Sequence, residues 1–238
     1  MNIRLLATVV FALALGGCTV TLAKDSVVLS DAAVAARKIT LPDKPVAAAA
    51  LAPGARLVTE DLTADFGTLH TVRLESDPAK PLIVFCGGNL FREEKVGAPF
   101  AESLAPFGDV LFFDYPGYGA SSGSGTRAEF AAAEKALLPR VETLTAGRTG
   151  PLIFWGHSLG GGVCASLAAN AKAKSALVLA ATFARYDDIK DNLLGWFSGA
   201  VDLMPADDLV VYDTPKLLKN YGGPIVVVAL SEDETIPY

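Results

Sequence analysis

The stretch IFWGHSLGGG, Ile153–Gly162, joins an apolar run to a serine that stands between glycines. The run Pro151–Gly156 is typical of a strand buried on both faces, and Leu159–Ala173 is typical of a helix rich in small residues. The motif G-x-S-x-G, Gly156–Gly160, therefore falls at a strand-to-helix turn. In such a turn a strained backbone presents the serine hydroxyl above the edge of the sheet. We expect Ser158 to be a nucleophile, placed at a helix N-terminus where free N–H groups favour negative charge.

The rest of the chain alternates apolar runs with segments that favour helices. The further apolar runs are Pro81–Gly88, Val110–Tyr115, Ser175–Phe183 and Pro224–Ser231. The helical candidates between them are Glu93–Pro106 and Thr126–Thr145, and Arg56–Ser76 indicates an early strand or hairpin. This alternation predicts an α/β fold, with a mostly parallel central sheet and helices on both faces. Ligands of such sheets bind at the carboxyl ends of the strands, where the glycine-rich turns of this chain fall.

A second glycine-rich turn supplies another component of a site. The sequence VFCGGN, Val84–Asn89, ends a predicted strand in two glycines that let a substrate approach the backbone. An oxyanion hole for acyl transfer takes one N–H from the residue after the nucleophile, here Leu159. We expect the other N–H to come from Gly88 or Asn89. Each such donor can lower the transition-state barrier by about 3 kcal/mol.

The motifs FDYPGYGASSG, Phe113–Gly123, and GHSLGG, Gly156–Gly161, together resemble the α/β-hydrolase superfamily. The branch they resemble contains small serine hydrolases with a D-Y-x-G-Y-G-x-S-x-G loop, among them bacterial serine aminopeptidase-like hydrolases and eukaryotic protein depalmitoylases. The resemblance covers roughly residues 56–238, with the motifs in the expected order, and it implies that Asp114 fixes its turn rather than taking part in catalysis. The family turn begins with His-Gly, whereas Cys86 or Gly87 stands here, which leaves the choice of the second oxyanion donor open.

The resemblance also implies an acid after a late strand. In the sequence VVVALSEDETIPY, Asp233 stands four residues before Pro237, in the D-x-x-x-P spacing of the family. Glu232 is the second choice for the same role. A carboxylate at this place would orient a histidine and stabilise its cation.

The histidine base has no evident candidate in the sequence. The chain holds two histidines, His70 and His157. His157 is adjacent to Ser158, so its side chain points away from the serine, and His70 lies before the first motif, where we expect a core or surface role. In the family the base follows the acid by some tens of residues. We therefore expect that the sequence is a fragment that lacks its last strand, histidine and helix; the alternative is a complete protein without hydrolytic chemistry.

Two functions follow from these observations. The first is a serine hydrolase that cleaves an ester, thioester or amide through an acyl-enzyme on Ser158, weakly active or inactive as the 238-residue chain. The second is a non-catalytic protein that binds a ligand or partner in the same pocket. Residues 184–222 form a possible cap, which would favour apolar acyl groups, or else an amphipathic helix packed on the domain. No cofactor is implied, and no Cys/His cluster has metal-ligand spacing.

The N-terminus resembles a bacterial lipoprotein signal. Arg4 precedes the apolar run Leu5–Leu15, which is too short to span a bilayer, and small residues stand directly before Cys18. The alternative is an ordinary secretory signal with an incidental cysteine. We expect a signal peptide at 1–17, lipidation of Cys18, an Ala/Pro-rich tether at 18–54 with a short helix near Asp31–Lys38, and a hydrolase domain at 55–238. The protein would then be anchored in the bacterial cell envelope, facing the periplasm or the exterior.

The net charge bears on possible partners, and the two remaining cysteines bear on whether the domain holds a disulfide. The net charge of −6 and the lack of a basic block disfavour a nucleic-acid partner. Cys86 and Cys164 each lie among apolar or small residues. We expect buried free thiols, with a disulfide as the alternative.

Overall fold

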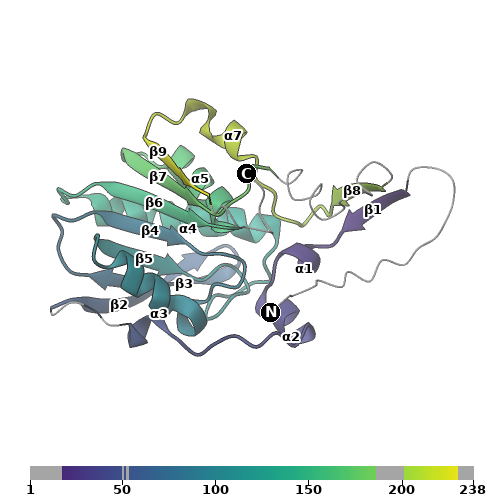
Figure 1. Cartoon of the computed structure of the whole chain (residues 1–238), viewed down its shortest axis with the longest axis horizontal. Helices are drawn as coiled ribbons and strands as arrows, with labels where there is room; N and C mark the ends of the chain where they lie inside the picture. The colour runs from purple at the N-terminus through teal and green to yellow at the C-terminus, as the bar shows by residue number, and fades with distance from the viewer. Residues whose placement is uncertain (1–17, 50, 52–53, 186–200, 230–238) are drawn as a thin grey trace.

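The computed structural model describes residues 18–49, 51, 54–185 and 201–229. Its main feature is a central seven-stranded sheet in the order β2-β3-β5-β4-β6-β7-β9 (Figure 1). The strands are β2 Arg56–Ala64, β3 Gly67–Glu75, β4 Leu82–Cys86, β5 Asp109–Phe113, β6 Leu152–His157, β7 Ser175–Ala180 and β9 Ile225–Val228. The neighbouring pairs β5–β4, β4–β6, β6–β7 and β7–β9 are parallel. Strands β2 and β3 form an antiparallel hairpin, and β3 pairs with β5 in antiparallel orientation. The predicted mostly parallel sheet is confirmed.

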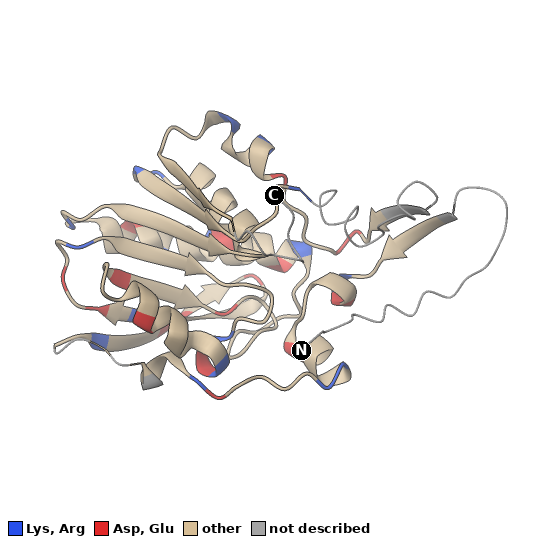
Figure 2. Ribbon diagram, viewed as in Figure 1, with Lys and Arg blue, Asp and Glu red and all other residues tan. Residues whose placement is uncertain are grey.

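Helices cover the sheet on both faces and create two hydrophobic cores. Helix α3, Glu93–Leu104, packs over a core that includes Phe85, Phe91 and Phe112, whereas α4, Arg127–Thr145, and α5, Gly160–Asn170, cover the other face. Figure 1 shows α3 on the opposite side of the sheet from α4 and α5. Strands β4, β6, β7 and β9 carry no Lys, Arg, Asp or Glu, as the tan strands in Figure 2 show. This composition is typical of parallel strands buried between helices.

The start of α4 shows how sequence fixes a helix boundary. Thr126 precedes the helix and accepts a hydrogen bond from the Glu129 N–H, while the Glu129 carboxylate accepts one from the Thr126 N–H. This reciprocal capping box satisfies N–H groups that have no partner within the helix.

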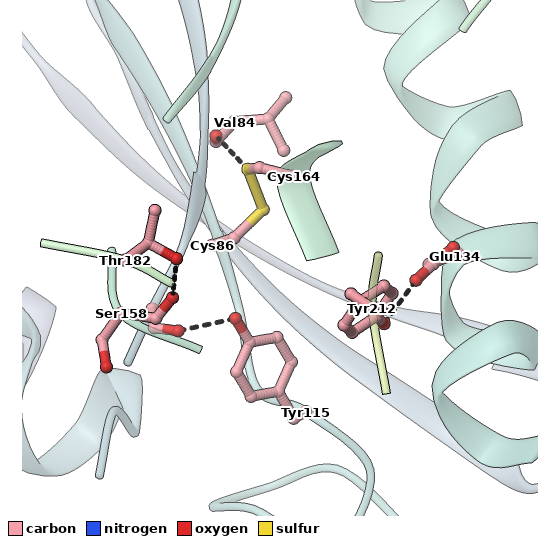
Figure 3. Close-up of a disulfide and its surroundings, with 9 residues drawn as sticks. Val84, Cys86, Tyr115, Glu134, Ser158, Cys164, Thr182 and Tyr212 are labelled. Carbon is pink, nitrogen blue, oxygen red and sulfur yellow. Dashed lines mark hydrogen bonds between the residues drawn. A yellow bond between two sulfur atoms is a disulfide. The ribbon is translucent and has the colours of Figure 1, made fainter. Parts of the chain in front are cut away.

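The expectation of free thiols at positions 86 and 164 is wrong. Cys86 at the end of β4 and Cys164 in α5 form a disulfide, with their Cα atoms 5.9 Å apart (Figure 3). Apolar surroundings suit a buried thiol and a buried disulfide equally well, and only the packing of α5 on β4 brings the two sulfurs together. The bond ties the strand that leads into the Gly87–Gly88 turn to the helix that follows Ser158.

The segment before residue 55 packs on the domain, whereas its composition predicts a tether; the short helix expected near Asp31–Lys38 is present. Residues 24–48 form α1 Lys24–Val27, α2 Asp31–Ala36 and the 3₁₀ helix η1 Val46–Ala48. The Val28 and Val46 side chains are fully buried, one in each hydrophobic core. Val28 and Val46 anchor this segment in the two cores, although it has no regular hydrophobic period.

A second, two-stranded sheet lies beside the domain. Strand β1, Cys18–Leu22, pairs in parallel with β8, Val201–Pro205, which belongs to the predicted cap region 184–222. Figure 1 shows this pair apart from the central sheet. The short helix α7, Thr214–Leu217, and the 3₁₀ helix η3, Leu218–Asn220, follow β8. Residues 186–200 of the predicted cap region lie outside the described residues.

The edge strand β9 is unusual among the parallel strands. All its residues are exposed, from 41% for Val228 to 69% for Val227. A run of exposed apolar side chains on a strand of a parallel sheet is rare, because such strands are normally covered on both faces.

In the part of the chain that the structure describes, no helix has the length and apolar character needed to cross a membrane.

Candidate active site

Ser158 occupies the sharp turn between β6 and α5. Its φ angle is +54°, a left-handed conformation that a residue with a side chain rarely adopts. Its N–H donates to the Ala180 carbonyl at 3.1 Å, and its own carbonyl accepts from the Thr182 hydroxyl at 2.6 Å (Figure 3). These bonds to the end of β7 hold the strained residue in place. Ser158 is half-buried, so it remains at the surface of the sheet edge instead of in the core.

The turn after β4 lies against Ser158. A Cβ atom added to Gly88 would lie 3.4 Å from the Ser158 Cβ and 3.0 Å from the His157 Nδ1. The Gly87 carbonyl accepts a hydrogen bond of 2.7 Å from the buried Tyr115 hydroxyl. This bond fixes the peptide group between Gly87 and Gly88. The residues predicted as nucleophile and as second oxyanion donor are thus next to each other. Leu159, the predicted first donor, follows the serine directly and is 5% exposed.

The Asp114 carboxylate organises the loop that follows β5. It is fully buried and accepts hydrogen bonds from the Glu93 N–H at 2.9 Å and from the Ala120 N–H at 3.0 Å. The loop is closed further by the Ser121 hydroxyl, which donates to the Asp114 carbonyl at 2.7 Å. These contacts are those of a residue that fixes a turn, as the resemblance implies. Burial raises the pKa of Asp114 to about 6, against the lowering effect of the two N–H donors.

This raised pKa makes the stability of the fold depend on pH. A carboxyl whose pKa is higher in the folded state than in the unfolded chain stabilises the fold most when it is protonated. We expect the free energy of unfolding of the wild type, relative to Asp114→Asn, to fall by about 2–3 kcal/mol between pH 4 and pH 7. Urea unfolding at pH 4, 5, 6 and 7 measures this difference. Parallel pH profiles would exclude a raised pKa for Asp114.

Both histidines have partners that suit a structural role. The His70 Nδ1 lies 2.6 Å from the Asp61 Oδ1, and its Nε2 lies 3.7 Å from the Glu93 Oε1. The His157 ring lies near Gly88 and packs 5.8 Å from the Phe100 ring on the face of the sheet that α3 covers. Asp233 and Glu232, the predicted acids, lie outside the described residues.

A cavity lies apart from this site. It has a volume of about 650 Å³ and is lined by residues from the first half of α4, from the second half of α5 and from the stretch between 210 and 221. On its wall the Glu134 carboxylate accepts from the Tyr212 hydroxyl at 2.7 Å and from the Ser166 hydroxyl (Figure 3). Ser158 and the Gly87–Asn89 turn are not part of its lining. Among the described residues, no group of three or more His, Cys, Asp or Glu side chains is placed to hold a metal ion.

Sequence reasoning missed the side chains that hold the backbone of the site in place. The hydroxyls of Tyr115 and Thr182 bond the backbone of the turn and of the nucleophile. The side chain of Asn89 bonds the segment at residues 27–29. Tyr115 belongs to the D-Y-x-G-Y-G loop, so the motif marks this residue but not the bond that its hydroxyl makes. Nothing in the sequence pattern marks Thr182 or the side chain of Asn89.

Comparison with known structures finds the same fold. An esterase from Pyrococcus furiosus matches in one crystal form with a TM-score of 0.59 and 14% identity, over 83% of this chain and 79% of that one. A second crystal form of that esterase gives 0.56 and 15%, over 80% and 75% of the two chains. A structure from a study of two prolyl endopeptidases gives 0.51 and 17%, over 79% of this chain and 31% of that one. A search of curated proteins finds no match.

A family comparison covers the elements described above. The model of the alpha/beta hydrolase fold matches residues 80–224, which is more than half of the chain. The matched region runs from β4 through the Asp114 loop and the Ser158 turn to the residue before β9. The chain belongs to the alpha/beta hydrolase fold family.

Proposed function

We propose that the protein is a serine hydrolase that cleaves an ester, thioester or amide through an acyl-enzyme on Ser158. The observation that carries this proposal is the left-handed Ser158 at the start of α5, with the Gly88 backbone beside it. Backbone strain of this kind costs about 1–3 kcal/mol and is found mainly at functional sites. The N–H groups of Leu159 and of Gly88 or Asn89 would hold the oxyanion, and Asp233 would orient the base.

The base is proposed to come from outside the 238 residues. His70 faces Asp61 and Glu93, and His157 packs against Phe100, so neither is arranged to accept the Ser158 proton. The exposed apolar strand β9 supports this proposal, because it offers an uncovered apolar edge on which further polypeptide would pack. The 238-residue chain alone should therefore hydrolyse p-nitrophenyl esters weakly or not at all. Turnover by this chain at rates normal for a serine hydrolase would contradict the proposal.

A fluorophosphonate probe separates the hydrolase from the alternative, a non-catalytic protein that binds a ligand in the same pocket. The probe reacts covalently with an activated serine, so the natural protein should be labelled and Ser158→Ala should not. Absence of labelling on a folded natural protein that contains every residue of the site would favour the binding protein. The substrate we propose is a small or acylated molecule.

We further propose that the protein is a lipoprotein of the bacterial cell envelope. The support is the sequence before Cys18, which has the order of a lipoprotein signal. Acyl chains on Cys18 would hold the protein on a membrane without a spanning helix. Cys18→Ser should abolish incorporation of radiolabelled palmitate and move the protein from the membrane to the soluble fraction. Unchanged labelling of the variant would rule out lipidation at this residue.

A further inference from the structure

The segment Val27–Asp31 bonds directly to the turn that carries the second predicted oxyanion donor. The Asn89 Oδ1 accepts from the Leu29 N–H at 2.8 Å and from the Tyr118 hydroxyl at 2.7 Å. The Asn89 Nδ2 donates to the Val27 carbonyl. The Asn89 side chain therefore bonds both to the segment and to the loop after β5, and its own backbone stays in the turn.

Arg92 forms a second connection between the same segment and the same turn. Its side chain is 1% exposed, and its Nε donates to the Asp31 Oδ1 at 2.8 Å. Its two Nη atoms donate to the Leu29 carbonyl and, at 3.3 Å, to the Asn89 carbonyl. The guanidinium also lies 4.1 Å from the centre of the Tyr118 ring. A buried cation that bonds two segments at once holds both of them in a fixed geometry.

The segment itself is firmly held, so it can act as a support. Val28 is fully buried, and Gly125 lies so close to it that an added Cβ would be 2.9 Å from the Val28 Cγ1. The Asp31 N–H donates to the Gly117 carbonyl at 2.8 Å. The position of the turn thus depends on a segment about sixty residues earlier in the chain.

We propose that Val27–Asp31 is a positioning element of the active site, acting on the oxyanion turn through the side chains of Asn89 and Arg92. The proposal rests on the proposed function, because it concerns the donor N–H of that turn. Oxyanion donors act only when they are held at the position where negative charge develops. A displacement of about 1 Å can cost about 100-fold in rate. Loss of these bonds should therefore lower kcat much more than it raises KM.

The test compares Asn89→Ala and Asp31→Ala with the wild type in the natural full-length protein. Asn89→Ala keeps the backbone N–H and removes the three side-chain bonds, and Asp31→Ala removes the carboxylate partner of Arg92. We expect each to lower kcat for a p-nitrophenyl ester by about 10- to 100-fold, with KM changed by less than about threefold. Rates are expressed per active site, counted by titration with a fluorophosphonate probe. Asp31→Asn keeps an oxygen that accepts from Arg92 and is expected to lose less than about threefold in kcat.

Asp43→Ala is the matched control. Asp43 also precedes the domain and also pairs with a cation near the start of α3, Lys95, at 3.5 Å, but its side chain is 86% exposed and does not contact the turn. We expect its kcat and KM to equal those of the wild type, because exposed ion pairs contribute little.

Three outcomes would overturn the proposal. They are an unchanged kcat per titrated site in Asn89→Ala and Asp31→Ala, a loss confined to the number of titrated sites, or an equal loss in Asp43→Ala. Failure of the proposed function itself gives a different result. In that case the wild-type protein is not labelled by the probe, and no kcat is measurable in any variant.

Discussion

Ser158→Ala in the natural full-length protein is expected to lower kcat for a p-nitrophenyl ester by about 10⁴- to 10⁶-fold. The variant keeps the glycines, the start of α5 and the adjacent turn, and it removes only the hydroxyl that forms the acyl-enzyme. The remaining rate would come from substrate binding and from the oxyanion donors, which still stabilise the negative charge that develops when water attacks the carbonyl. Steady-state kinetics of purified protein, with circular dichroism to verify folding, measures the effect.

Ser166→Ala provides the control for this change. Ser166 lies in α5, the helix that follows Ser158, is 7% exposed and bonds Glu134 on the wall of the separate cavity. We expect its kcat to stay within about threefold of the wild type. A hydrolase that retained its activity in Ser158→Ala would have another nucleophile.

Gly160→Ala is expected to destabilise the fold by at least about 4 kcal/mol. A Cβ atom at this position would lie 2.0 Å from the carbonyl oxygen of Cys86 and 2.4 Å from its carbonyl carbon. Both atoms belong to the backbone at the end of β4, which the disulfide to Cys164 also holds, so the clash cannot be relieved by a side-chain rotation. Urea unfolding compared with the wild type measures the loss.

Gly222→Ala is the corresponding control, because an added Cβ there meets no atom within 4 Å among the described residues. We expect a change in the free energy of unfolding of less than about 0.5 kcal/mol. A Gly160→Ala protein as stable as this control would mean that α5 and β4 do not approach as closely as described.

The central sheet could be predicted because its strands have distinctive compositions. Runs such as Pro81–Gly88 and Pro151–Gly156 are apolar without alternation, which only strands buried between helices require, and they became β4 and β6. The helix predicted over Thr126–Thr145 became α4, Arg127–Thr145. The helix after Ser158 is predicted to reach Ala173, but α5 ends at Asn170. Helix ends depend on few local bonds and are therefore the least predictable boundaries.

The features that were missed depend on contacts between distant parts of the chain. The disulfide joins residues 78 positions apart, and apolar surroundings alone do not distinguish it from two free thiols. The segment at residues 24–48 is held by single buried valines and by the polar side chains of Asn89 and Arg92. Such contacts leave no periodic pattern in the sequence. The sequence therefore predicted a tether with one short helix, which became α2, but it did not predict the packing of this segment on the domain.

The candidate site was accessible to sequence reasoning only in part. Ser158 and the turn at Gly88 belong to local strand-to-turn motifs, and parallel neighbours β4 and β6 bring the ends of these strands together. The supporting hydroxyls of Tyr115 and Thr182 bond backbone atoms, and a backbone bond can be made by many side chains. Their positions follow from the completed fold and not from any motif.

The most direct test of the central claim is to locate the covalent adduct of a fluorophosphonate probe on the natural protein. Tandem mass spectrometry of the digested, labelled protein identifies the modified residue. Our account predicts one adduct for each folded molecule, on Ser158. An adduct on any other residue of an active protein, or hydrolysis that continues while Ser158 remains unmodified, would contradict it.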